Sequence, residues 1–68
     1  MHERLNNSLR EVRSAKGLTQ AELAEKAGVS RKTINTVENG VFVPSTVLAL
    51  RLARALATTV EALFQLPD

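Results

Sequence analysis

The protein has 68 residues, no cysteine and a net charge of +2, which predicts one small domain without disulfides or cysteine-ligated zinc. A small domain without such cross-links is typical of the cytoplasm, and no leader peptide or apolar run of about 18 residues predicts export or contact with a membrane. Hydrophobic residues make up 44% of the chain but aromatic residues only 3%. The core therefore has to consist of Leu, Val, Ile and Ala, which favours an all-α fold.

The first helix is expected at about residues 7–16, just before Gly17. Its apolar residues recur at spacings of four and three, which is typical of one buried helix face. They are Leu5, Leu9 and Val12. An asparagine, Asn6 or Asn7, is expected to cap the start of this helix.

The second helix is expected at about residues 19–26, because two independent start signals coincide there. Thr19 and Glu22 have the spacing of a capping box, in which each side chain accepts a hydrogen bond from the backbone N–H of the other residue. Leu18 and Leu23 occupy the two positions of a hydrophobic staple.

The third helix is expected at about residues 30–39, with Ser30 as its cap and a three-residue turn around Gly28 before it. Ile34 and Val37 share the face that would pack on the domain. The opposite face is polar or positively charged and consists of Lys32, Asn35, Thr36 and Asn39. A merely solvated face is the alternative explanation, although the Glu-to-Lys pairs typical of such a face are missing.

Two further helices complete the predicted fold. One is expected from Pro44 and Ser45 to Leu56, and a short one from Thr59 to Phe64. The sequence therefore predicts an all-α domain of five short helices.

The second and third helices fit a helix-turn-helix, because they are short and joined by a tight turn that contains glycine. The second helix of such a motif lies in the major groove of DNA. Arg31 and Lys32 can donate to guanine O6 and N7. Asn35 can pair with adenine N6 and N7, and the Thr36 methyl group can contact a thymine methyl group. Two side chains at the helix starts can reach phosphate oxygens, namely Gln20 and Ser30.

Three segments, LTQAELAEKAGVSRKTINTVENG, PSTVLALRLARAL and VEALF, together resemble the Cro and lambda-repressor type helix-turn-helix family over about residues 5–66. Within that family the chain is most similar to small standalone dimeric repressors such as the cytolysin repressor. The resemblance implies one lambda-repressor-like DNA-binding domain over residues 1–68. It further implies a homodimeric repressor of transcription on an inverted-repeat operator in double-stranded DNA, with residues 60–68 as a dimerisation tail.

The resemblance also implies roles for single residues. Gln20 would bind the DNA backbone at the start of the second helix, and Asn35 would contact either a base or a phosphate. The residues that face bases would be Arg31, Lys32 and Thr36. Those near phosphates would be Ser30, Thr33 and Asn39. A structural ion pair is implied between Arg13 and Glu38.

Several positions depart from the family pattern, among them Thr46 and Val47, where a leucine and a polar residue are common; the start of the fourth helix could therefore pack against something external. Val41 stands where a basic residue often follows Asn-Gly, which puts a contact to the DNA backbone in doubt there. Ala57 stands where glycine or asparagine often ends the fourth helix, and a left-handed cap is costlier for alanine.

Apolar residues after the third helix and in the tail either fill the core or contact a partner. They are Val41, Phe42, Val43, Leu63, Phe64 and Leu66. Contact with a second copy of the chain is favoured by the small interior of a domain of this size. Contact with a different protein would make the chain an antitoxin-like or adaptor module in which DNA binding is secondary. The modest net charge favours that alternative.

No catalytic or metal-binding constellation is predicted. His2 is the sole histidine and cysteine is absent, so neither a metal site nor a catalytic triad can be assembled. The glycines lack the spacing of a phosphate-binding loop. We therefore expect a protein that is not an enzyme and uses no metal or cofactor.

Overall fold

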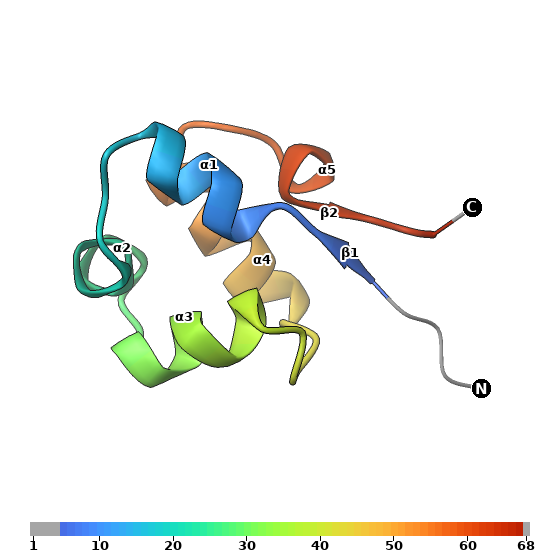
Figure 1. Ribbon diagram of the computed structural model, residues 1–68, viewed down its shortest axis with the longest axis horizontal. Coiled ribbons are helices and arrows are strands. Elements are labelled where there is room, and N and C mark those ends of the chain that lie inside the picture. The colour runs from blue at the N-terminus through green and yellow to red at the C-terminus, as the bar shows by residue number, and fades with distance from the viewer. Residues whose placement is uncertain (1–4, 68) are drawn as a thin grey trace.

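The computed structural model describes residues 5–67, and His2 lies outside that range. The helices are α1 (Leu9–Ala15), α2 (Gln20–Ala27), α3 (Arg31–Glu38), α4 (Thr46–Ala55) and α5 (Val60–Leu63). Two short strands, β1 (Asn6–Asn7) and β2 (Phe64–Gln65), form an antiparallel sheet (Figure 1). The predicted class, a domain of five short helices, is confirmed. The strand pair was not predicted.

Side chains at the helix starts explain where the helices begin. The predicted capping box is present: the Glu22 N–H donates to Thr19 Oγ1 at 3.0 Å, and the Thr19 N–H donates to Glu22 Oε1 at 2.8 Å. A Ser or Thr oxygen likewise accepts from the third backbone N–H of each of the next three helices. These caps are Ser30, Ser45 and Thr59.

The start of α1 differs from the prediction, because the two asparagines belong to β1. The helix begins at Leu9, and Ser8 occupies the cap position without a capping hydrogen bond from its side chain. Asn7 Oδ1 instead accepts from the Leu9 N–H at 2.9 Å.

The strand pair joins the two ends of the described chain. Asn6 lies opposite Gln65 and Asn7 opposite Phe64, and the Ser8 N–H adds a hydrogen bond of 2.8 Å to the Leu63 carbonyl. The Asn7 side chain also donates to the carbonyl of Val37 near the end of α3. This contact therefore ties β1 to the end of α3.

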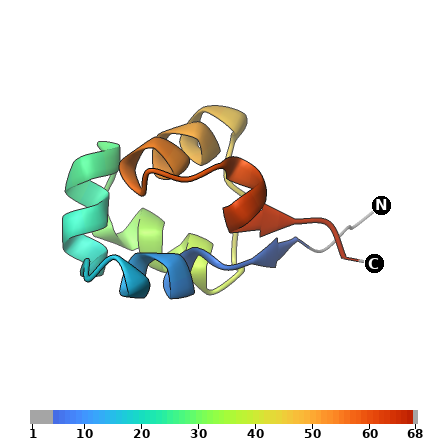
Figure 2. The same ribbon diagram turned by 90° about the horizontal axis from the view of Figure 1, so that it is seen from above.

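The core lies between the helices, with the strand pair at one end of the molecule (Figure 2). Its fully buried large side chains are Leu9, Leu23, Ile34, Val37, Leu52, Leu56 and Leu63. Phe64 is only 7% exposed and belongs to the same cluster. Leu63 and Phe64 thus fill the core, because the pairing of β2 with β1 holds this segment against it. Of the three tail residues that were expected to fill the core or contact a partner, Leu66 is the exposed one, at 67%.

Ala57 has a left-handed conformation just after α4, with φ +53°. The Thr58 N–H donates to the Ala53 carbonyl at 2.9 Å, which closes the end of the helix. A non-glycine residue in this conformation costs about 1–2 kcal/mol, as expected for the departure from glycine at this position.

Candidate nucleic-acid interface

Helices α2 and α3 form the helix-turn-helix. Gly28 ends α2 at φ +74°, and the Val29 N–H donates back to the Ala24 carbonyl at 3.0 Å. The chain turns sharply there, so that α3 crosses α2 at a steep angle and lies along one edge of the domain (Figure 1). Ile34 and Val37 are fully buried and hold α3 on the core.

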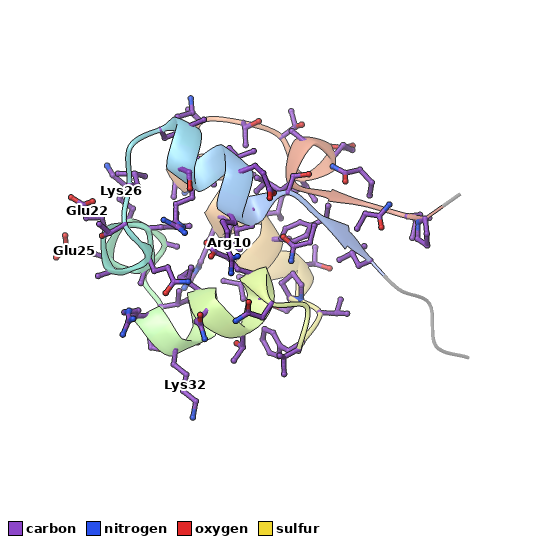
Figure 3. The ribbon with its side chains drawn as sticks, in the orientation of Figure 1. Arg10, Glu22, Glu25, Lys26 and Lys32 are labelled. Carbon is purple, nitrogen blue, oxygen red and sulfur yellow. The ribbon has the colours of Figure 1, made fainter. Side chains whose placement is uncertain are left out.

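The outer face of α3 carries the residues predicted to contact DNA. The exposed ones are Arg31, Lys32, Asn35 and Asn39, with Ser30 at the cap. Lys32 extends away from the domain into solvent (Figure 3). Thr33 and Thr36 are partly buried, and the Thr36 hydroxyl donates to the Thr33 carbonyl at 3.0 Å. Because the hydroxyl is already hydrogen-bonded within α3, the methyl group is the part of the Thr36 side chain that is left for an apolar contact.

A largely buried ion pair joins α1 to the end of α3. Arg13 Nε lies 2.6 Å from Glu38 Oε2, and Arg13 Nη2 donates to Glu38 Oε1 at 3.2 Å. Arg13 Nη1 also donates to the Leu18 carbonyl at 2.8 Å. The Glu38 side chain is 0% exposed and that of Arg13 13% exposed. These two residues were predicted to pair, and a bidentate contact of this kind fixes the orientation of both side chains.

Glu38 is also the meeting point of three helices. Its Oε1 accepts from Gln20 Nε2 of α2 at 3.0 Å and from Arg10 Nε of α1 at 3.4 Å. Burial raises the pKa of Glu38, but the hydrogen bonds from Arg13, Gln20 and Arg10 and the positive charge of Arg13 outweigh it, so that the net pKa is lowered. The hydrogen bond to Glu38 in turn raises the pKa of Arg13. Both groups are therefore charged at neutral pH.

Three amide side chains continue these contacts to the surface. Gln20 Nε2 donates to Asn35 Oδ1 at 3.2 Å, and Asn39 Nδ2 donates to the same oxygen at 3.3 Å. Arg10 Nη2 donates to Asn39 Oδ1 at 3.0 Å. We call the whole set the polar network; it consists of Arg10, Arg13, Gln20, Asn35, Glu38 and Asn39.

Two members of the polar network differ from what the sequence suggested. Both donors of the Gln20 amide are used within the protein, whereas Gln20 was expected to offer this group to the DNA backbone. Arg10 was not singled out, although it precedes Arg13 by three residues and so lies on the same side of α1. That spacing was the available signal.

The lowered pKa of Glu38 predicts a dependence of stability on acid. Because the folded-state pKa lies below the unfolded value of about 4.3, ionised Glu38 stabilises the fold fully above that value. The contribution is lost as pH falls through the folded-state pKa. Glu22 acts in the same direction, since its hydrogen bonds with Thr19 lower its pKa. Urea denaturation between pH 7 and pH 2 should show a shallower loss of stability for Glu38→Gln than for the wild type, and equal slopes would contradict this role.

Apolar side chains gather at a second region of the surface. Six large ones are exposed among residues 5–67: Val41, Phe42, Val43, Val47, Leu50 and Leu66. Leu50 and Leu66 border a groove of about 500 Å³ that also reaches Leu5 and Pro44. These last two residues border a neighbouring hollow of about 340 Å³ as well, together with Phe42 and Val43.

We call the joined region the apolar surface; it consists of Phe42, Val43, Val47, Leu50 and Leu66. Val47 belongs to it because Val47 and Leu50 line a further hollow together. The sequence left Phe42, Val43 and Leu66 open between the core and a partner contact, and it did not single out Leu50. Leu50 could have been found from the sequence, because it is an apolar residue on the outer side of α4.

Other kinds of site have little support in the described part of the chain. Residues 5–67 contain no group of three or more His, Cys, Asp or Glu side chains that could hold a metal ion. Over the same residues no helix is long and apolar enough to cross a bilayer.

Comparison with protein families gives one match that spans most of the domain. The family model described as helix-turn-helix matches residues 9–63, which include all five helices.

Individual proteins are similar over nearly the same length. An uncharacterized HTH-type transcriptional regulator of Methanothermobacter thermautotrophicus is 49% identical over 61 residues, which is 88% of each chain. One from Archaeoglobus fulgidus is 42% identical over 64 residues, covering 94% of this chain and 91% of the relative. The crystal structure of the restriction-modification controller protein C.AhdI from Aeromonas hydrophila superposes with a TM-score of 0.76 at 43% identity, over 78% of this chain and 80% of that one.

Proposed function

The chain belongs to the helix-turn-helix family of DNA-binding transcriptional regulators, and we propose that it is a homodimeric repressor that binds an inverted-repeat operator through α3. The observation that carries this proposal is the position of α3. Its inner face is held by buried Ile34 and Val37 and its end by Glu38, so the polar outer face is presented on a rigid element. A repressor of this kind needs no catalytic, metal or cofactor site. We expect it to act on DNA in the cytoplasm.

The proposed contacts divide into those that read bases and those that bind phosphates. Base edges are assigned to Arg31, Lys32, Asn35 and the Thr36 methyl group, because these residue types suit base contacts and lie on the outer face of α3. Phosphates are assigned to Ser30, Thr33 and Asn39. For Gln20 the backbone N–H in the first turn of α2 is the proposed phosphate donor, since its side-chain amide already binds Asn35 and Glu38.

The apolar surface supports the homodimer. A contiguous exposed apolar region on a domain of this size marks a contact site, and a two-fold dimer buries the same patch on both copies. Such a dimer would place two α3 helices in successive major grooves, about 34 Å apart. An inverted-repeat operator with half-sites one helical turn apart follows from that symmetry.

Leu50→Glu should convert the dimer to a monomer, because it places a charge in the apolar surface, where Leu50 is 57% exposed and lines two of the hollows. The fold should be retained, since the side chain is not part of the core. Sedimentation equilibrium would measure the change in mass, and operator affinity should fall with it. Lys16→Glu provides a matched control, because Lys16 is also exposed but lies at the end of α1. If Leu50→Glu sediments like the wild type, the dimer does not form through this surface.

The first experiment is selection of bound duplexes from a random-sequence library at near-physiological salt. The expected result is an inverted repeat with half-sites one helical turn apart. A single enriched half-site would retain the regulator and remove the dimer. The affinity for the selected duplex should fall steeply with salt, with a slope of about −0.9 for each phosphate neutralised.

The exposed loop after α3 favours one second candidate, a protein-interaction module. Val41 and Val43 are 74% and 65% exposed, and neither side chain suits a phosphate. In this alternative the loop would bind an unrelated protein and DNA binding would be secondary. Absence of any enriched duplex, together with stable co-purification of a different chain, would favour it over the repressor.

A further inference from the structure

Asn35 is held by two hydrogen bonds to the same atom. Its Oδ1 accepts from Gln20 Nε2 at 3.2 Å and from Asn39 Nδ2 at 3.3 Å. A carbonyl oxygen has two lone pairs, so these bonds use its capacity. The remaining polar atom of this exposed side chain, Nδ2, has only hydrogens to offer.

The orientation of the Asn35 amide follows from Glu38. A carboxylate can only accept hydrogen bonds, and the lowered pKa keeps Glu38 ionised. The atom of Gln20 that lies 3.0 Å from Glu38 Oε1 must therefore be its NH₂ group. The second hydrogen of that group points at Asn35, where only an oxygen can receive it.

The same orientation follows independently from Arg10. A guanidinium group can only donate, so the Asn39 atom that lies 3.0 Å from Arg10 Nη2 must be Oδ1. The Asn39 NH₂ group is then directed at Asn35. An inverted Asn35 amide would set its own NH₂ group against two other NH₂ groups, and both ends of the polar network therefore select the same arrangement.

We propose that Asn35 reads the operator as a hydrogen-bond donor only, and that Gln20 is, with Asn39, one of two positioning residues that enforce this. The proposal rests on the proposed function, since it concerns a base contact of α3. A donor can bind guanine O6 or N7 or thymine O4, and adenine only through a single bond to N7. Adenine is disfavoured, because its pairing with asparagine needs Oδ1 to accept from N6 while Nδ2 donates to N7. The pairing of Asn35 with adenine that residue type alone suggested is thereby replaced.

The test begins by locating the base pair that Asn35 contacts. Duplexes are selected from a random library with the wild type and with Asn35→Ala, and the contacted position is the one where only the variant loses its preference. The wild type should prefer guanine or thymine there on the contacted strand. Discrimination against adenine should be roughly 5- to 150-fold, as for a typical specific base contact.

The decisive variant is Gln20→Met, which keeps the length of the side chain and removes its donor. Asn35 can then invert with only the Asn39 bond to lose, so discrimination against adenine at that position should fall by about fivefold or more. Gln65→Met is the matched control, because Gln65 lies in β2 and donates to the Glu61 carbonyl outside the polar network. It should leave the preference unchanged. A purely structural role for Gln20 would lower affinity for all sequences evenly.

Each result bears on a different claim. Enrichment of no sequence by the wild type would overturn the proposed function and this inference with it. An enriched operator with adenine at the Asn35 position, or with no position that depends on Asn35, would overturn the inference alone. If the wild type prefers guanine or thymine at that position and Gln20→Met keeps the same preference, the positioning role of Gln20 is overturned. Relaxation in Gln20→Met but not in Gln65→Met supports the proposal.

Discussion

Replacing Glu38 with alanine is expected to lower the free energy of unfolding by about 3–5 kcal/mol, the usual cost of removing one partner from a buried ion pair. The Glu38 side chain is 0% exposed and its oxygens accept from Arg13, Gln20 and Arg10. The variant would leave Arg13, which is largely buried, without its counter-charge. A domain of this length has a total stability of roughly 3–10 kcal/mol, so the loss is a large fraction of the total.

Urea denaturation followed by circular dichroism would measure this loss, with Glu25→Ala as the control. Glu25 is exposed and projects from α2 into solvent (Figure 3), and its replacement should change stability by no more than about 0.5 kcal/mol. Arg13→Ala should cost nearly as much as Glu38→Ala, and the double variant should cost less than the sum of the two. Additive losses would show that the two residues do not act as a pair.

Ile34→Ala is the second large effect, with an expected loss of about 2–5 kcal/mol. Ile34 is fully buried and belongs to the inner face of α3, so truncation leaves a cavity between the recognition helix and the core. The outer face is unchanged, and operator affinity per folded molecule should therefore stay close to that of the wild type. Thermal and urea denaturation would give the stability, and titration at a temperature where the variant is folded would give the affinity.

Val41→Ala is the matched control for Ile34→Ala, because it removes a β-branched side chain that is 74% exposed. At low protein concentration, where dimers do not contribute, its stability should lie within about 0.5 kcal/mol of the wild type. Equal losses for the two variants would contradict the assignment of Ile34 to the core. Loss of affinity by a fully folded Ile34→Ala would show that core packing positions α3 on DNA.

Local signals in the sequence were sufficient for the helices. The capping box of Thr19 and Glu22 and the glycine at position 28 act between residues close in the chain, so the start of α2 and the turn before α3 could be predicted. The outer face of α3 followed from helical periodicity in the same way. The ion pair of Arg13 and Glu38 was implied by family resemblance, because spacing alone does not bring residues 25 apart together.

Those local signals could not predict contacts between segments that are far apart in the sequence. Asn6 and Asn7 form a two-residue strand only because residues 64 and 65 lie beside them, and so short a strand has no periodicity to detect. Gln20 and Asn35 are polar residues of the kind expected on a protein surface. The hydrogen bond between them depends on how α2 and α3 cross, which their residue types do not reveal. Leu63 and Phe64 could be assigned to the core only once the strand pair was known.

The strand pair also has a consequence for how the protein is made. Asn6 and Asn7 leave the ribosome well before their partners, Phe64 and Gln65. Until residue 65 has emerged, the sheet cannot close and Leu63 and Phe64 cannot complete the core. A nascent chain that already holds α2 and α3 therefore lacks these contacts. The fold is completed only after residue 65 has emerged, at the entropic cost of closing the loop between residues 7 and 64.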